Sequence, residues 1–277
     1  MVEQISQEDP PFFAVIDPEG PLLPILISIP HAGTVIPEED KGLFQASILA
    51  NLEDTDWALD ELYNFAPKMG ITVIQANLSR YVIDLNRNPA GERLYADARI
   101  ETGIVPTQTF SGLPVYENFE PTPEFIHART KKYFDPYYEK IGSILIELRN
   151  TFKQVLFFDA HSIVRILPRF PSTPFPDLML GDREGKSAAP EISALAQAEL
   201  RRQAIYEVTY NYPFKGGNLT RHWGKPSYGV HSLQLEMCQD LYLNEATKRL
   251  NPEKAEKLQL ALRSLFLALA KHLAGES

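Results

Sequence analysis

The sequence predicts an α/β fold, with one mixed, mostly parallel central sheet flanked by helices. Short apolar segments alternate along the chain with longer stretches of helical periodicity, and this alternation is typical of such sheets. The chain has 277 residues, of which 44% are hydrophobic, which is enough for one sizeable core. It shows no internal repeat, low-complexity tract or linker, so we expect residues 1–277 to form a single domain.

Short apolar segments are predicted to be buried strands. The first of them carries the sequence LPILISI and ends at Pro30, and the later ones are similarly short and rich in β-branched or aromatic residues. The predicted strands are residues 23–29, 71–76, 155–159, 205–210 and 230–236.

Helical patterns lie between these strands. Pro136 interrupts a long pattern, which we expect to bend or break there, whereas Pro190 suits the first turn of a helix. The last pattern carries a broad face of Leu and Phe residues. The predicted helices are residues 56–65, 122–152, 190–204 and 252–273.

Long connecting segments are predicted at residues 89–121 and 168–176. The first is rich in Gly, Pro and Thr, and the second is rich in Pro. Loops of this length inside a compact domain are usually functional or mobile. We therefore expect residues 168–176 to form a surface excursion or a lid.

Composition excludes several classes of function. The formal net charge of −9 disfavours nucleic-acid binding, and no apolar run is long enough to span a membrane. The N-terminus lacks the pattern of a secretory signal, and Cys238 is the only cysteine. We therefore expect a cytoplasmic protein, and nothing in the sequence indicates its oligomeric state.

Two histidines are placed alike after predicted strands. His31, in IPHAG, follows the strand 23–29, and His161, in DAHS, follows the strand 155–159. Ligands of open α/β sheets bind beyond the carboxyl ends of strands, so both rings can present a nitrogen to one metal ion. Asp159 could orient His161, as metal-bound histidines commonly require, although either histidine alone could be an ordinary hydrogen-bonded side chain.

An acidic segment, EDTDW at residues 53–57, offers a carboxylate to such a site. A carboxylate is the usual oxygen ligand beside two histidines at a catalytic zinc ion. Asp54 and Asp56 are the candidates, and either could instead cap the helix that follows.

Arginines flank the alternating, strand-like segment SRYVIDLNR. Arg80 and Arg87 could each grip a substrate carboxylate with two parallel hydrogen bonds, and Asn86 could add an amide donor. The alternative is a surface ion pair, for example between Arg80 and Asp84.

The segment PFKGGNLTRHWG, residues 213–224, is a further candidate for substrate binding. Its paired glycines, which include Gly217, permit a tight turn or a close approach of backbone to ligand. Arg221 and His222 could then contact substrate, although an ordinary glycine-rich turn is equally consistent with the pattern.

Glu236 ends the apolar strand 230–236, where an acidic residue is unusual unless it is paired or functional. Beside a metal-bound water it would be a natural general base, and a buried salt bridge is the alternative. Cys238 with His231 or His222 could form a nucleophile–base pair, although a buried inert thiol is the simpler interpretation.

In their order from residue 30 to 237, PHAG, DTDW, SRYVIDLNR, DAHS, PFKGGNLTRHWGKP and GVHSLQLEM resemble the N-formylglutamate amidohydrolase family. That family hydrolyses N-formyl-L-glutamate to formate and L-glutamate in histidine degradation. The resemblance covers most of the chain, and DLNR and GGNLTRH are its most specific parts. It implies a hydrolase of a linear amide bond that takes a small acidic substrate.

The family is more remotely similar to zinc carboxypeptidases and to deacylases such as aspartoacylase. This similarity implies a zinc-carboxypeptidase-like, phosphorylase/hydrolase-like fold and a divalent metal, with zinc favoured. It further implies His31 and His161 as ligands, Asn86–Arg87 as the carboxylate clamp and Glu236 as the base. Carboxypeptidases place an acidic ligand three residues after the first histidine, where this chain has Thr34, so we prefer Asp56 over Asp54 as the third ligand.

Other functions fit the same residues. The machinery could release another acyl group, such as acetyl or succinyl, or cleave a peptide-like bond. A protein that captures an acidic amino acid without turnover is the non-enzymatic alternative.

Overall fold

A seven-stranded sheet forms the centre of the computed structural model, which describes residues 11–92, 102–170, 173–202 and 204–275. The strand order is β1-β3-β2-β4-β7-β5-β6. The inner pairs of β3, β2, β4 and β7 are parallel, whereas β1 and β5 pair antiparallel with their inner neighbours. The strands are β1 (Phe13–Ile16), β2 (Ile25–Ile29), β3 (Thr72–Ala76), β4 (Val155–Ile163), β5 (Leu178–Gly181), β6 (Val208–Tyr210) and β7 (Val230–Cys238). The α/β fold with a mostly parallel central sheet is therefore confirmed.

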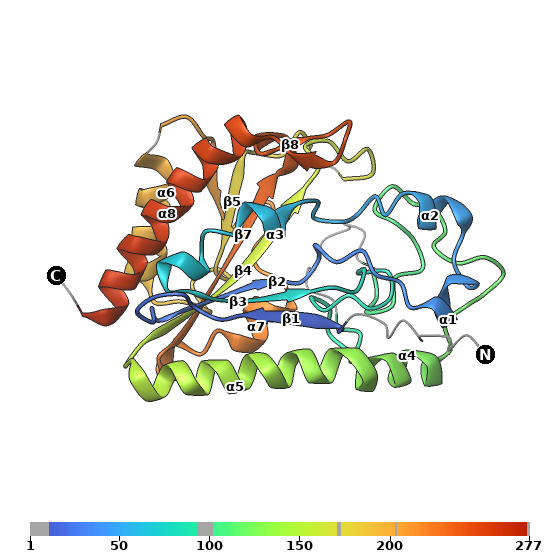
Figure 1. Cartoon of the computed structure of the whole chain (residues 1–277), viewed down its shortest axis with the longest axis horizontal. Helices are drawn as coiled ribbons and strands as arrows, with labels where there is room; N and C mark the ends of the chain where they lie inside the picture. Colours follow the sequence, from blue (N-terminus) through green and yellow to red (C-terminus); the bar gives the residue numbers. More distant parts are fainter. Residues whose placement is uncertain (1–10, 93–101, 171–172, 203, 276–277) are drawn as a thin grey trace, which may run out of the picture.

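Helices cover both faces of the sheet (Figure 1). On one face lies α5 (Asp135–Thr151), whose Tyr137 hydroxyl is hydrogen-bonded to Ser28 on β2. On the other face lie α6 (Pro190–Arg202) and α8 (Pro252–Ala274), which pack on the apolar side chains of β2, β4 and β7. Because each face has a helical cover, strands β2 and β4 are buried along their whole length.

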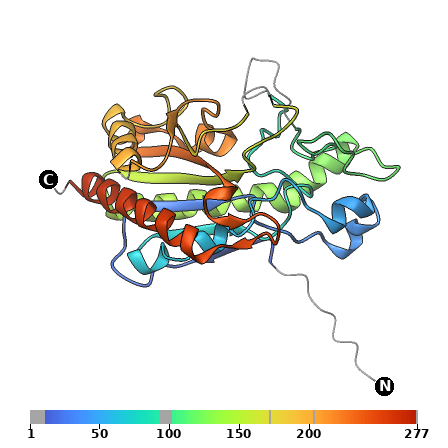
Figure 2. The same ribbon diagram turned by 90° about the horizontal axis from the view of Figure 1, so that it is seen from above.

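Shorter elements complete the described chain. In both views the short helices α1 and α2 lie at the opposite end of the molecule from the C-terminus (Figures 1 and 2). These elements are α1 (Glu38–Lys41), α2 (Ala46–Ala50), α3 (Leu59–Leu62), η1 (Pro67–Met69), α4 (Pro123–Arg129), η2 (Thr130–Phe134), α7 (Asn218–Trp223), η3 (Pro226–Tyr228), η4 (Gln239–Leu241), β8 (Leu243–Asn244) and β9 (Arg249–Leu250).

Helix α8 shows how local sequence sets the boundaries of an element. The Asn251 side chain accepts a hydrogen bond from the backbone N–H of Lys254, and Pro252 occupies the first turn, which are both favoured at a helix start. Gly275 ends the helix in the left-handed conformation, at φ 77°. The predicted helix 252–273 is thus confirmed.

Two helix predictions were wrong in detail. The pattern 122–152 does not break at Pro136: α4, the π-helical turn η2 and α5 follow one another without a gap, and Pro136 lies in the first turn of α5. The predicted helix 56–65 is reduced to α3, because Ala58 adopts a left-handed conformation (φ 53°). Asp56 therefore lies in a loop.

Strand predictions were wrong mainly in length. Strands β4 and β7 continue beyond the predicted ends at residues 159 and 236, so His161 lies within β4 rather than after it. Residues 80–87, predicted to be strand-like, form turns. Strands β1 and β5 were not predicted.

The predicted long connections are present where the structure describes them. Residues 93–101 and 171–172, which fall within those two loops, lie outside the described residues. Among the described helices, none is both long and apolar enough to cross a membrane. The single domain over residues 1–277 and the carboxypeptidase-like fold remain predictions.

Candidate metal centre

The predicted ligands His31, Asp56 and His161 come together in one buried cluster. Each offers a ligand atom, and these atoms lie within 4.8 Å of one another. Nδ1 of His31 lies 4.0 Å from Oδ2 of Asp56, and Nδ1 of His161 lies 3.4 Å from the same oxygen. His31 follows β2, His161 belongs to the adjacent β4, and Asp56 precedes α3, so the sheet topology creates the cluster.

Asp84 fixes the ring of His31. Its Oδ1 lies 2.8 Å from Nε2 of His31, and because a carboxylate only accepts, the proton is on Nε2. Burial lowers the pKa of His31 to about 4, and the charge of Arg80 adds to this effect. The ring is therefore neutral, with the lone pair of Nδ1 turned towards Asp56, as a metal ligand requires.

Asp159 and Asn86 both lie against the far nitrogen of the His161 ring. Oδ1 of Asp159 forms an ion-pair contact with Nε2 of His161 at 3.0 Å, and Nδ2 of Asn86 lies 2.8 Å from the same nitrogen. Burial alone would lower the pKa of His161, but Asp159, Asp56 and Glu236 raise it well above its ordinary value. The surrounding carboxylates thus favour positive charge at this point, which a divalent ion would supply.

Asp56 rather than Asp54 reaches the cluster. Asp56 is 2% exposed, and its Oδ2 also accepts a hydrogen bond from the backbone N–H of Ser162. The carboxylate of Asp54 instead accepts a hydrogen bond from the backbone N–H of Phe110. Burial raises the pKa of Asp54 to about 6. The geometry supports the preference for Asp56 over Asp54.

This donor set fits a divalent ion. Two imidazole nitrogens and one carboxylate oxygen are the usual protein ligands of a catalytic zinc ion. Each imidazole also has a carboxylate oxygen within 3.0 Å of its far nitrogen, as metal-bound histidines commonly have. Both histidines are 3% exposed. Zinc suits the set best, although other divalent ions accept the same ligands.

Glu236 stands beside His161 on the neighbouring strand. The two residues are partners in the parallel register of β4 and β7, so their side chains project from the same face of the sheet. Burial raises the pKa of Glu236 to about 8, with the charge of Asp56 adding and those of His161 and Arg80 opposing. A carboxylate with this proton affinity is suited to general base catalysis near neutral pH.

The guanidinium group of Arg80 is buried and contacts protein groups. Its Nη2 lies 2.6 Å from Oδ2 of Asp84, its guanidinium stacks 4.6 Å from the ring centre of Phe110, and it is 5% exposed. Burial alone would lower the pKa of Arg80, but the carboxylates of Asp84, Asp54 and Asp56 raise it. The ion pair with Asp84 is buried, not a surface pair as the sequence alternative had it.

Asn86 lies between the cluster and α7, and Arg87 follows it in the chain. Nδ2 of Asn86 lies 3.2 Å from Oδ2 of Asp159 and 2.8 Å from Nε2 of His161, and its Oδ1 accepts from the N–H of Leu219. Arg87 donates to the carbonyl oxygens of Thr102 and Asn86. The amide of Asn86 is thus occupied by protein groups, and the roles of both residues in carboxylate binding stay predictions.

The glycine-rich segment approaches the same region. The N–H of Gly217 donates to Oε1 of Gln234 at 2.7 Å, and a Cβ at this position would lie 2.4 Å from the amide of Asn86. Only glycine permits this approach. Arg221 follows one turn later in α7, whereas His222 is exposed and packs edge-on against Tyr138. Substrate contact by these residues is still a prediction.

Asp84 is a partner of the cluster that the sequence did not reveal. It was considered only as an ion-pair partner of Arg80, although its place inside DLNR was an available signal.

Cys238 does not form a nucleophile–base pair with His231. The thiol is fully buried, donates to the carbonyl oxygen of Pro176, and has its pKa raised to about 12 by burial. His231 lies at the other end of the same nine-residue strand, β7. A thiol in this state is inert.

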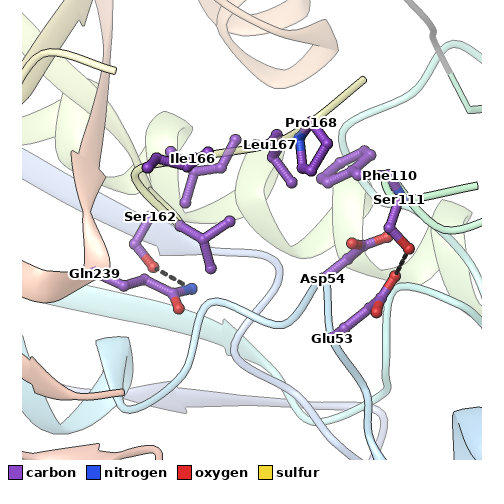
Figure 3. Close-up of a pocket in the computed structure, with 11 residues that line it drawn as sticks. Glu53, Asp54, Phe110, Ser111, Ser162, Ile166, Leu167, Pro168 and Gln239 are labelled. Atoms are coloured by element: carbon purple, nitrogen blue, oxygen red, sulfur yellow. Dashed lines mark hydrogen bonds between the residues drawn. The ribbon is translucent and has the colours of Figure 1, made fainter. Parts of the chain in front are cut away.

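A cavity of about 230 Å³ adjoins the cluster. In Figure 3 Ile166, Leu167 and Pro168 lie along one side of it, and Glu53 and Asp54 lie at one end. The cavity was not predicted, because its walls come from chain segments far apart in the sequence.

Comparison with known proteins identifies relatives over most of the chain. A family described as N-formylglutamate amidohydrolase matches residues 23–243. The N-formylglutamate deformylases of Pseudomonas aeruginosa and Pseudomonas putida are each 36% identical to this chain over 250 residues, which cover 89% of it and 92% of each relative.

Two solved structures are also similar to this chain over most of its length. The N-formylglutamate amidohydrolase of Ralstonia eutropha JMP134 is 28% identical, with a TM-score of 0.79 over 96% of this chain and 99% of that one. A protein of Agrobacterium tumefaciens is 18% identical, with a TM-score of 0.71 over 94% of this chain and 95% of that one. The second likeness shows a shared fold alone.

Proposed function

Because this chain belongs to the N-formylglutamate amidohydrolase family, we propose that it hydrolyses N-formyl-L-glutamate to formate and L-glutamate. Membership makes the chain a hydrolase of a linear carbon–nitrogen amide bond. The observation that carries the proposal is the buried cluster of His31, Asp56 and His161, with Glu236 on the neighbouring strand. This arrangement has the parts that metal-assisted amide hydrolysis needs.

The cluster would hold a divalent ion, preferably zinc, through Nδ1 of each histidine and a carboxylate oxygen of Asp56. When bound, such an ion lowers the pKa of a water from about 16 to about 7 and polarises the carbonyl group of the substrate. Asp84 keeps the ring of His31 in the tautomer that leaves Nδ1 free.

Glu236 is the proposed general base. Its carboxylate accepts a proton from the attacking water and later delivers that proton to the amine nitrogen that leaves. The pKa of about 8 caused by its burial supports this role, because a catalytic base works best with a pKa near the operating pH. The charges of His161 and Arg80 limit this rise of the pKa.

The substrate carries two carboxylates, which need cationic partners in a chain of net charge −9. Arg87 and Arg221 are the proposed partners, since guanidinium groups bind carboxylates with two parallel hydrogen bonds. Gly217, Asn86 and His222 are proposed to shape this part of the pocket.

Arg80 was predicted to bind a substrate carboxylate. Its pairing with Asp84 and its burial support a positioning role instead, in which it holds Asp84 against His31. Its charge also lies close enough to Glu236 to lower the pKa of that carboxyl.

The test is a formate-release assay on N-formyl-L-glutamate, combined with metal analysis of the purified protein. We expect turnover with one divalent ion per chain. Tight capture of glutamate without formate release, even with metal added, would replace the enzyme by a binding protein. A place in histidine degradation and a cytoplasmic location rest on the family alone and belong to this proposal.

A further inference from the structure

The cavity beside the metal centre has an apolar wall and an acidic end. Ile163, Val164, Ile166 and Leu167 contribute the apolar wall, and Glu53 and Asp54 form the acidic end (Figure 3). Its volume is about 230 Å³, whereas an apolar cavity of about 150 Å³ already accommodates a benzene ring. The space is thus large enough for several carbon atoms.

Ser162 and Asp54 connect the cavity with the cluster. Ser162, which lines it, donates its N–H to Oδ2 of Asp56 at 3.1 Å. Asp54, at the acidic end, lies two residues before Asp56, and Phe110 stacks on the guanidinium of Arg80. The cavity therefore lies next to the cluster, on the side of Ser162.

The register of β4 and β7 places the cavity on one side of the reacting centre. Paired positions on the same face are Asp159 with Gln234, His161 with Glu236, and Ile163 with Cys238. Successive rows are about 7 Å apart. Gly217 binds Gln234 on one side of the His161–Glu236 row, and the cavity begins at Ile163 on the other side.

Charge decides which half of the substrate lies on which side. The side of α7 carries Arg221, one of the proposed partners of the substrate carboxylates, whereas the cavity carries the carboxylates of Glu53 and Asp54. An acidic amino acid is attracted to the first side and repelled by the second. The acyl group on the other side of the amide bond must then point into the cavity.

We propose that this cavity is an acyl subsite and that the enzyme hydrolyses N-acyl-glutamates whose uncharged acyl chains are longer than formyl. The inference rests on the proposed function and extends its substrate class. A formyl group has only a hydrogen atom on this side and leaves the space unused, whereas a butyryl chain fills the apolar part. The acidic end disfavours an acyl group with its own carboxylate, such as succinyl.

The reaction is the same hydrolysis. The oxygen of water forms a bond to the acyl carbon, the carbon–nitrogen bond breaks, and the nitrogen keeps the electron pair and takes a proton from Glu236. The acyl group leaves as its carboxylate, and glutamate is the common product.

Glutamate release is measured with N-formyl-, N-butyryl- and N-succinyl-L-glutamate on the metal-loaded protein. We expect kcat/KM for the butyryl substrate within tenfold of that for the formyl substrate, and a value at least 100-fold lower for the succinyl substrate. If the protein hydrolyses N-formyl-L-glutamate but not N-butyryl-L-glutamate, the acyl subsite is overturned and the proposed function is retained. Hydrolysis of neither overturns both.

Substitutions of residues that line the cavity test whether it determines the preference for the acyl chain. Val164→Phe narrows the cavity, so the butyryl-to-formyl ratio of kcat/KM should fall at least tenfold, whereas Leu260→Trp on the exposed face of α8 should leave the ratio unchanged. A ratio that Val164→Phe does not change contradicts the assignment. As a second, independent variant, Glu53→Gln/Asp54→Asn removes both charges and should raise the succinyl-to-formyl ratio at least tenfold; an unchanged ratio would remove the acidic end from the subsite.

Discussion

Asp84 Oδ1 lies 2.8 Å from Nε2 of His31, while Oδ2 of the same carboxylate lies 2.6 Å from Nη2 of Arg80. The carboxylate is fully buried. Burial alone would raise the pKa of Asp84, but Arg80 and Arg87 hold it well below its ordinary value. Asp84 thus stays ionised and fixes the orientation of a metal-ligand candidate 53 residues away in the sequence.

Replacing Asp84 should weaken metal binding without removing a ligand. Asp84→Asn takes away the charge that holds the Nε2–H of His31, and loss of such an orienting partner typically costs 10–100-fold in metal affinity. Zinc affinity measured by competition with a chelator checks this. Glu61→Gln, which removes an exposed acid on α3, is the matched control; equal affinities in the two variants would contradict the role of Asp84.

Removal of the metal should abolish hydrolysis and lower thermal stability. An ion that binds only the folded chain stabilises it, by about 2.7 kcal/mol when its concentration is 100 times Kd. We expect a chelator to stop formate release and zinc to restore it, with a rise in the unfolding midpoint. His161→Ala should lose this rise, whereas His272→Ala, on the exposed face of α8, should keep it. Full activity in metal-free protein would exclude metal catalysis.

Glu236→Gln should lower turnover while leaving metal content unchanged. Glutamine fills the same space beside His161 but takes no proton, and a lost general base typically costs about 10²–10⁴ in rate. Formate release and metal analysis on the same preparation measure both quantities. Glu191→Gln, at the exposed start of α6, serves as the control. Wild-type turnover in Glu236→Gln would show that another group is the base.

The convergence of His31 and His161 could be predicted from sequence. Apolar runs mark the central strands, and parallel neighbours carry their C-terminal residues to one edge of the sheet. The ends of β4 and β7 could not be predicted in the same way. The apolar pattern stops at Asp159, but the strand continues because Asn86 and Thr220 supply hydrogen bonds to that buried carboxylate. A strand interior tolerates such a group only when it is paired.

The contacts that irregular segments make could not be predicted from the sequence. The bond between His31 and Asp84 depends on the path of the turns at residues 80–87, which have no periodic pattern. The cavity likewise combines residues 53–54, 110–111 and 162–168 with Gln239. Residue propensities predict where helices and strands form, but they do not predict which loops contact each other at the edge of a sheet.

Arg87→Ala should weaken substrate recognition. Loss of one partner of a charge-assisted pair costs roughly 2–4 kcal/mol in transition-state binding, so kcat/KM should fall mainly through KM. Arg201→Ala, on the exposed end of α6, is the control. An unchanged KM for N-formyl-L-glutamate in Arg87→Ala would remove Arg87 from the pocket.

A second buried carboxylate, Asp182, lies in the loop after β5 and accepts hydrogen bonds from residues of neighbouring segments. It accepts hydrogen bonds from Oγ of Ser193, the hydroxyl of Tyr210, Nδ2 of Asn211 and the N–H of Gly185. Burial alone would raise the pKa of Asp182, but these hydrogen bonds outweigh it and hold the pKa below its ordinary value of 3.8. The ionised form is therefore favoured more strongly in the folded chain than in the unfolded chain.

The contribution of Asp182 to stability should accordingly depend on pH. A lowered folded pKa stabilises the fold above about pH 4, and this part is lost as the pH falls through the folded pKa. Asp182→Asn should cost about 2–3 kcal/mol at pH 7, and the difference from wild type should shrink below pH 4. Urea unfolding at a series of pH values, with Asp60→Asn as the control, measures it. A difference that is constant from pH 7 to pH 3 would mean that the charge of Asp182 contributes nothing.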